Sequence, residues 1–534
     1  MTAWRLDAYS ANTLWARIAE FSSNEAGAVE RSLHGVYFED YFRALDAKTM
    51  LAELNYVDRD FLEDYAAYYV RCFHAYKRTC VRIHFFDQSI TAAEFEALFG
   101  KDDALEQRLA SSYLGFVVIR PLPERVIGRT CLKTYPAADG RSFPITRSYK
   151  ANLFGLELKV DTLAFQEQDS VIAACATSAL WSAFHGTGII FHHRIPSPVE
   201  ITRAATAHVA DDTRVLPSSG LTTAQMADAI RACDLEPFMM KPATELDLQA
   251  AVRAYVLGKV PVLLVGPVFK REDFLPDAEA SNRDEPKVLG IHAVAVTGFR
   301  TAEAPPAAAG RFCLEAMRID KLYCHDDRVG PFARMEISFL DREKRPYLST
   351  SSAPSTEDIG TLVFRHGILV PVYHKIRVGY LRVLREIAVF DDYLRWLRSE
   401  AVPSLECVVW DVYLTAANEL KARWLAEPSV GPKRRDLLER PLPRYVWLAR
   451  GRTDEGGAVE LLFDATGLEA AKLCVQFAES STTLLSTVAA ITEALRHDHD
   501  PVFAEFPLCV GILESITPKQ SASIRGASPA QAPS

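Results

Sequence analysis

The chain has 534 residues, of which 49% are hydrophobic, 10% aromatic and 24% charged. This composition is typical of a globular protein rather than a disordered one, and the length predicts roughly two to four domains. The formal net charge of -9 argues against a nucleic-acid binder, because neutralising phosphates requires a concentrated surface of Lys and Arg.

The sequence indicates neither a membrane segment nor a secretory leader. Residues 1–21 place charged side chains such as Arg5, Arg17 and Glu20 among the apolar ones, so a signal peptide is not expected. The longest apolar run, 260–269, falls well short of the ~18 residues that a bilayer-spanning helix needs. We therefore expect a cytoplasmic protein that has no contact with a membrane.

The ten cysteines form no CxxC pair and have no regular spacing. Metal centres and disulfide frameworks need clustered ligands, so neither is expected, and no cofactor is implied. Most of these thiols stand in apolar surroundings, which is typical of small buried hydrophobic residues.

The first region, residues 1–154, is expected to be mixed α/β. Thr91 and Glu94 form a capping box that opens a helix, and 114–119 predicts a buried strand. No residue pattern in this region points to chemistry.

The second region, residues 155–345, alternates helical and strand patterns in a helix-first, sheet-later order. The predicted helices are 171–184, 223–233 and 246–257, and the predicted strands are 260–265, 291–297 and 314–324. The small, Pro-rich stretch 301–310 is expected to be an exposed loop between the last two strands. The fold class is therefore expected to be α+β, with a domain boundary near 341–358.

The third region, residues 346–518, is again expected to be mixed α/β. Its predicted elements are a strand at 367–372, helices at 391–397 and 416–425, and a hairpin of 445–449 with 459–463. The tail 519–534 is rich in Ser, Ala, Pro and Gln and is expected to be disordered.

One cysteine, Cys175, stands in a pattern that suggests a nucleophile. Small residues surround it in Ala173-Ala174-Cys175-Ala176-Thr177-Ser178, and the pattern predicts a helix here. A cysteine attacks as thiolate, which a helix N-terminus or a neighbouring imidazolium favours. Gln168 could offer its amide to an oxyanion beside the Cys175 N–H, and Gln166 competes for that role.

Two further stretches carry a candidate base and a candidate orienting carboxylate. His292 shares a strand face with Val294 and Val296, which taken alone is typical of a core histidine. Asp326 and Asp327 follow a predicted strand end and precede Gly330-Pro331, which taken alone is typical of a turn.

Taken together, these stretches resemble the papain-like cysteine peptidases. The order Cys, then His-x-Val-x-Val, then Asp at the end of the next strand is closest to the compact bacterial branch that cleaves double-glycine leader peptides. The resemblance covers about 155–335 and is strengthened by Gly220-Leu221-Thr222-Thr223 and by the segment 258–262. Three departures are Ala176 where the family has Gly, the wider spacing from Gln168 to Cys175, and Asp327 where the family commonly has Pro.

The resemblance implies a papain-like domain in which a helix bearing Cys packs on an antiparallel sheet bearing His and Asp. Cys175 would be the nucleophile, His292 the base, Asp326 the orienter with Asp327 as its alternative, and Gln168 part of the oxyanion hole. The expected activity is hydrolysis of a peptide or isopeptide bond in a protein or peptide substrate, and the flanking regions could bind a partner protein. Alternatives are an inactive scaffold or sensor and a transglutaminase-like acyltransferase.

Overall fold

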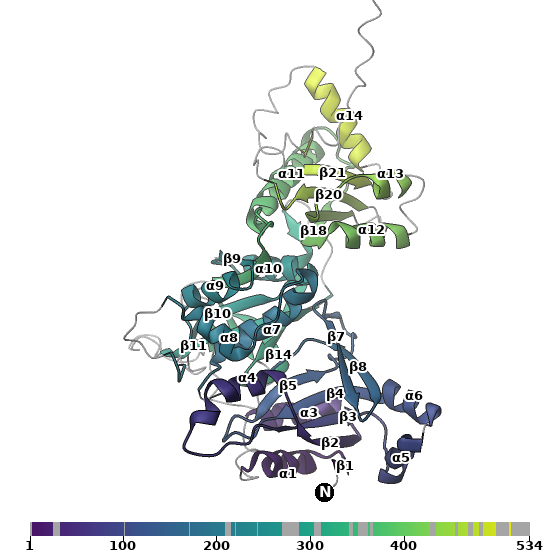
Figure 1. Cartoon of the computed structure of the whole chain (residues 1–534). Helices are drawn as coiled ribbons and strands as arrows, with labels where there is room; N and C mark the ends of the chain where they lie inside the picture. The colour runs from purple at the N-terminus through teal and green to yellow at the C-terminus, as the bar shows by residue number, and fades with distance from the viewer. Residues whose placement is uncertain are drawn as a thin grey trace, which may run out of the picture. The chain divides into compact units, whose positions relative to one another are not determined.

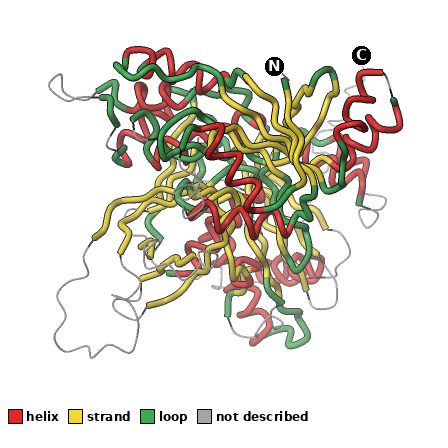
Figure 2. The backbone as a smooth tube through the Cα atoms, turned by 90° about the horizontal axis from the view of Figure 1, so that it is seen from below, coloured by secondary structure: helices red, strands yellow, loops and turns green. Residues whose placement is uncertain are grey.

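A computed structural model describes residues 3–24, 33–100, 102–169, 171–208, 215–218, 220–242, 244–269, 288–303, 311–340, 345–350, 361–363, 367–427, 434–453, 458–467, 474–479, 484–497 and 512–513. Helices and strands both occur throughout these residues, as the colours of Figure 2 show, and the sheets are mainly antiparallel. The fold class is α+β, as predicted.

The chain forms two compact units (Figure 1). The first contains 1–304 and 316–374, and the second contains 305–315 and 375–534. The boundaries predicted near 154 and 345 therefore both lie inside the first unit. The stretch 341–358, where a boundary was predicted, contributes a strand to that unit's main sheet.

The first unit begins with a sheet of strand order β1-β2-β3-β4-β5 in which every neighbouring pair is antiparallel. A two-stranded sheet of β7 and β8 follows it in the chain. The strands are β1 (Trp4–Ala8), β2 (Thr49–Tyr56), β3 (Cys80–Phe86), β4 (Tyr113–Ile119), β5 (Ile127–Leu132), β7 (Arg147–Leu153) and β8 (Leu156–Thr162). The helices are α1 (Ala11–Ser22), α3 (Leu33–Ala44), α4 (Arg59–Ala67), α5 (Ala92–Ala97) and α6 (Asp103–Ser112), with 3-10 turns η1 (Tyr69–Arg71) and η2 (Leu98–Gly100).

The main sheet of the first unit has the order β6-β11-β13-β14-β15-β16-β10-β17-β9. Because β10 also pairs with β11, part of this sheet forms a closed ring. The ring consists of β11, β13, β14, β15, β16 and β10, in that order. The strands are β6 (Arg141–Ser142), β9 (Leu235–Met240), β10 (Val262–Phe269), β11 (Val288–Thr301), β13 (Ile319–Asp326), β14 (Gly330–Leu340), β15 (Arg345–Thr350), β16 (Thr361–Val363) and β17 (Gly367–Tyr373). All eight residues of β10 are buried, as expected of a strand covered on both faces.

Four helices that come before strand β10 in the chain lie beside this sheet. They are α7 (Cys175–Ile190), α8 (Pro198–Ala205), α9 (Thr223–Arg231) and α10 (Glu245–Leu257), and the short η4 (Glu315–Arg318) precedes β13. Helix α7 contacts β10, β11 and β13, and α8 and α9 contact α7 (Figure 1). Twelve consecutive residues of α7 are buried, so this helix is surrounded by protein along most of its length.

The second unit is built on a sheet of order β12-β18-β19-β20-β21. Its strands are β12 (Cys313–Leu314), β18 (Val408–Ala416), β19 (Tyr445–Thr453), β20 (Ala458–Asp464) and β21 (Cys474–Glu479), and its helices are α11 (Tyr380–Glu400), α12 (Ala417–Ala426), α13 (Arg434–Glu439) and α14 (Leu484–His497). One buried cluster joins α12 and α13 to the sheet through Leu420, Trp424, Leu437, Val446, Leu448 and Leu462.

Most predicted elements are present with shifted ends. The capping boxes at Thr91 and Thr222 and the hairpin of β19 and β20 are confirmed. The strand predicted from 314 begins at Ile319, because 315–318 form a 3-10 turn, and the helix predicted at 391–397 is part of the longer α11. The predicted tail 519–534 and residues 304–310 of the predicted loop lie outside the described residues.

The helix predicted to start at 171 begins at Cys175 instead. The Asp169 carboxylate accepts hydrogen bonds from the backbone N–H groups of Val171, Ile172 and Ala173. An aspartate side chain that binds nearby N–H groups competes with the helical hydrogen-bond pattern, so the helix starts after this turn.

Within the described residues, no helix is both long and apolar enough to cross a membrane. The eight cysteines whose side chains are described are all free thiols.

Candidate active site

The segments predicted to meet do so at one cavity of about 810 Å³ in the first unit. Cys175 lines it from the start of α7, Gln168 from the segment before that helix, and His292 from β11. The opposite lining comes from the start of α9 and the residues before it, including Ser218, Leu221, Thr222 and Gln225. Asp326 stands behind His292, fully buried.

Cys175 is the first residue of α7 and is partly exposed. The residue before it, Ala174, caps the helix without any side-chain hydrogen bond. The first N–H groups of a helix have no acceptor within the helix, and they point toward its positive dipole end. The Cys175 backbone N–H therefore lies in a segment suited to binding a developing negative charge.

Of the two candidate oxyanion glutamines, only Gln168 lines the cavity. Gln166 is buried, and its side-chain Nε2 has no hydrogen-bond partner. Arg120 donates hydrogen bonds to the main-chain carbonyls of Glu167 (3.1 Å) and Gln168 (3.3 Å) and so fixes the backbone there. The geometry favours Gln168 over Gln166 for the oxyanion position.

His292 is buried on β11 between the cavity and an acidic turn. Its Nε2 lies 2.9 Å from Oδ1 of Asp326, which leaves Nδ1 as the ring nitrogen for the cavity side. Burial and Arg328 lower the pKa of His292. Asp326 and contact with the Cys175 thiol raise it by more, so that the net pKa is raised to about 10. The imidazolium form is therefore favoured while the ring stays between the carboxylate and the sulfur.

The Cys175 sulfur also lies 3.9 Å from the main-chain carbonyl oxygen of Ile291. One edge of β11 is covered by β10, with which Ile291 pairs in register opposite Pro267. Strand β13 pairs with β11 only from Ala295 onward. Among the described residues, no strand therefore pairs with the β13-facing edge of β11 before Ala295, and this edge is open there.

The adjacent carboxylates Asp326 and Asp327 have opposite environments. Asp326 accepts hydrogen bonds from His292 and from the Arg328 backbone N–H (3.0 Å) and guanidinium. Burial raises the pKa of Asp326, but Arg328 and His292 lower it far below its usual range. Neither carboxylate oxygen of Asp327 has a hydrogen-bond partner, and burial raises its pKa. Asp326 is therefore the carboxylate that orients His292, while Asp327 lies 3.8 Å from the same ring nitrogen.

One group of described residues has ligand atoms close enough for a metal ion: His292, Asp326 and Asp327, all within 4.8 Å of one another. A cation there would have to displace the Arg328 guanidinium from Asp326 and break the bond from His292 Nε2. The existing contacts of these three residues are those of an imidazole held by a carboxylate rather than those of a metal site.

The other histidines near these stretches in the sequence do not line the cavity. His185 contacts the Tyr149 hydroxyl at 3.0 Å, and His193 contacts the Thr187 hydroxyl at 2.8 Å. His325 lies next to the Asp326 turn, but its Nδ1 is 3.3 Å from the Ser182 hydroxyl. These rings have local hydrogen-bond partners within the protein.

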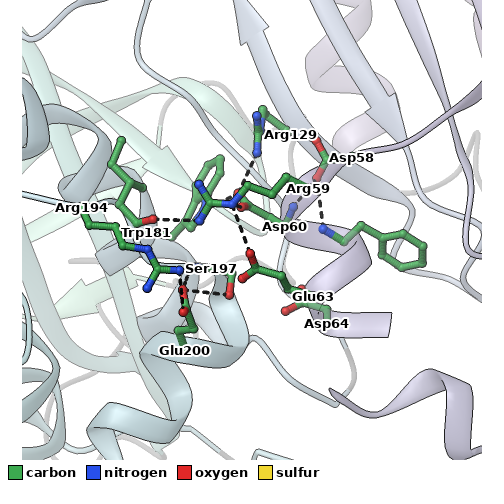
Figure 3. A network of polar contacts seen from close by, with 12 residues as sticks. Asp58, Arg59, Asp60, Glu63, Asp64, Arg129, Trp181, Arg194, Ser197 and Glu200 are labelled. Carbon is green, nitrogen blue, oxygen red and sulfur yellow. Dashed lines mark hydrogen bonds and ion pairs between the residues drawn. The ribbon is translucent and has the colours of Figure 1, made fainter. Parts of the chain in front are cut away.

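A network of polar contacts joins α7 to the N-terminal region (Figure 3). The indole N–H of Trp181 donates to Asp60 at 3.0 Å, and Arg129 contacts the same carboxylate at 2.8 Å. Asp64 accepts a hydrogen bond from the backbone N–H of Val199 at the start of α8. The helix that carries Cys175 is thus held by residues from α4 and β5.

Sequence reasoning missed the residues that support the site from the N-terminal region. Arg120, Asp60 and His34 are far from Cys175 in the chain, and no local pattern marks them. Arg328 had a usable signal, because a cation two residues after a candidate orienting carboxylate can pair with it.

Comparison of the chain with protein-family models, with curated proteins and with solved structures finds no match.

Proposed function

We propose that this protein is a cysteine hydrolase with a papain-like catalytic domain, which cleaves a peptide or isopeptide bond through an acyl-enzyme. The observation that carries the proposal is the convergence of three distant segments. A thiol at a helix N-terminus and an imidazole held by a buried carboxylate line one cavity. A helix packed on an antiparallel sheet that bears the histidine supports the same proposal.

The reaction follows from the positions of these groups. His292 accepts the Cys175 proton, and the sulfur attacks the substrate carbonyl carbon while the Cys175 N–H and the Gln168 amide bind the oxyanion. His292 then gives its proton to the leaving amine, the C–N bond breaks, and the acyl thioester remains. Water, deprotonated by His292, attacks the thioester and releases the acid and the thiol. Asp326 keeps the ring oriented and stabilises the imidazolium.

A peptide substrate also suits the open edge of β11. The Ile291 carbonyl near the sulfur could accept a hydrogen bond from a substrate backbone N–H. Pairing with such an edge would hold the chain extended across the thiol. This favours a peptide over a small ester, which has no N–H to offer.

Site-resolved alkylation tests the proposal. The full chain is treated with iodoacetamide at neutral pH, and modification of each cysteine peptide is followed by mass spectrometry. Cys233 is the internal control, since burial raises the pKa of its thiol to about 12 although it is partly exposed. We expect Cys175 to react at least tenfold faster than Cys233, and His292→Gln to remove most of that difference.

Turnover of a peptide library, with Cys175→Ala as the control, completes the test. Peptide products that depend on Cys175 and carry a free acid support hydrolysis, and transfer to the lysine amine of an added peptide, with little release of the acid, would favour the acyltransferase alternative. A Cys175 no more reactive than Cys233 would favour the inactive scaffold and would end the proposal.

A further inference from the structure

The N-terminal helix α3 contacts both sides of the candidate site through one buried side chain, His34, which is 4% exposed. Its Nδ1 lies 3.0 Å from the main-chain carbonyl oxygen of Val329, and its Nε2 lies 3.1 Å from Oε1 of Glu167. Val329 belongs to the turn that follows Asp326, and Glu167 directly precedes Gln168. One imidazole therefore bridges the orienting carboxylate's turn and the oxyanion segment.

Both ring nitrogens of His34 face acceptors. A carbonyl oxygen can only accept, so Nδ1 carries a proton, and the carboxylate opposite Nε2 favours a proton there as well. Although burial lowers the pKa of His34, Glu167 and the Val329 carbonyl together raise it by more. Burial raises the pKa of Glu167, but His34 and Arg120 lower it. Both shifts favour the charged forms, an imidazolium beside a carboxylate.

Side chains of α3 contact three successive residues after the Asp326 turn begins: Val329, Gly330 and Pro331. The Val329 N–H donates to the Asp326 carbonyl at 2.9 Å, which closes the turn. Gly330 has φ +152°, and a Cβ at this position would clash with the ring of Tyr37, one turn after His34. The Tyr37 hydroxyl donates to the Pro331 carbonyl. Helix α3 thus fixes the backbone that sets the position of the Asp326 carboxylate.

The oxyanion segment is held at the other end of the bridge. The second carboxylate oxygen of Glu167 accepts the Ile127 N–H at 3.0 Å, and the Glu167 N–H donates to the Ile127 carbonyl at 3.0 Å. Arg125 contacts Oε1 at 3.2 Å. Because Glu167 is fixed on several sides, the ion-pair contact of His34 Nε2 with its carboxylate, at 3.1 Å, ties the position of the Asp326 turn to that of the segment carrying Gln168.

We propose that His34 is a positioning residue that aligns the His292–Asp326 pair with the Gln168 segment across the cavity. The inference rests on the proposed cysteine chemistry of Cys175. If His34 has this role, the N-terminal region is part of the catalytic unit. The helix that carries His34 lies more than a hundred residues before Cys175 in the sequence.

The test measures how the alkylation rate of Cys175 depends on pH. His34→Gln keeps a polar side chain of similar length but carries no charge for the Glu167 carboxylate. We expect it to lower the neutral-pH rate at Cys175 by roughly tenfold to a hundredfold and to shift the midpoint of the profile to higher pH, because a misplaced Asp326 holds the His292 imidazolium less well. His74→Gln, which changes an exposed histidine of the same unit, is the matched control and should leave the profile unchanged.

Glu167→Gln provides a second route if His34→Gln fails to fold. The double variant His34→Gln with Glu167→Gln should change the rate by less than the product of the two single effects, since both act through one contact. Cys233 in the same samples reports general loosening of the unit. A folded His34→Gln protein with an unchanged Cys175 profile, or with Cys233 alkylated faster to the same degree that Cys175 slows, overturns the inference. Neither result touches the proposed function, which fails only if Cys175 in the unaltered protein is no more reactive than Cys233.

Discussion

Each unit of the molecule contains a buried tryptophan whose indole N–H donates to a carboxylate that also contacts an arginine. In the first unit the set is Trp181, Asp60 and Arg129. In the second, one such set is Trp424, Glu460 and Arg423, with an indole-to-carboxylate distance of 2.9 Å. The local chemistry of the two sets is therefore nearly the same.

The two sets differ in what they join. Trp424 and Glu460 lie on α12 and β20, whose side chains already share the apolar cluster of the second unit. Trp181 lies on the helix that begins with Cys175, and Asp60 lies on α4, more than a hundred residues earlier. A buried ion pair by itself therefore says little about function. The link to a cavity with a thiol and an imidazole is what marks the first unit.

The largest expected effect is on peptide turnover, and it distinguishes Asp326, which contacts His292, from Glu460, which contacts Trp424. Asp326→Asn should lower peptide turnover by about 10²–10⁴-fold, because the amide cannot stabilise the imidazolium and can favour the wrong tautomer. Glu460→Gln should leave turnover within about twofold while lowering thermal stability. Turnover and melting temperature are measured on both. Loss of turnover in Glu460→Gln at a temperature where the protein is folded would remove the distinction between the units.

The second prediction compares two buried histidines of the first unit by the pH dependence of stability. The pKa of His292 is raised to about 10, so the folded protein keeps a proton that the unfolded chain loses above ~6.5, and stability from His292 falls as pH rises toward 10. Burial lowers the pKa of His84 to about 4 despite Glu53, so the unfolded chain binds the extra proton and stability falls as pH drops from ~6.5 to 4.

Urea unfolding across this range checks both signs. The difference in unfolding free energy between the unaltered protein and His292→Gln should shrink by up to about 1.4 kcal/mol per pH unit above 7, the slope of a single proton. The difference for His84→Gln should shrink below pH 6.5 instead. Parallel curves for the two variants would show that His292 is not held as an imidazolium.

Local patterns in the sequence predicted most elements, whereas the grouping of Cys175, His292 and Asp326 was expected only from the resemblance to papain-like peptidases. Capping boxes and apolar runs are short-range signals; in the structure Gln168 and His292 line one cavity, and His292 contacts Asp326. The start of α7 was wrong by four residues, because the Asp169 side chain captures three N–H groups.

What the sequence did not indicate was long-range support. Nothing near residue 34 or 60 shows that these side chains meet Glu167 and Trp181, because their partners are set by the tertiary fold. The predicted boundary near 154 lies inside one compact unit, and contacts such as Trp181 with Asp60 and His34 with Glu167 cross it.

The smallest expected effect is on the alkylation rate of Cys175 when either of the two tryptophans is replaced. Trp181→Phe and Trp424→Phe each remove an indole N–H from a buried carboxylate, and each should lower stability by about 1–3 kcal/mol, the cost of leaving such an acceptor short of a donor. Hydrogen exchange should speed up in α7 for the first variant and in α12 for the second. Only Trp181→Phe should also slow alkylation of Cys175, by a few-fold, because only that tryptophan anchors the helix that presents the thiol. Equal slowing in both variants would mean that the reactivity of Cys175 follows overall stability rather than the anchoring of α7, and the contrast between the two units would then lose its functional meaning.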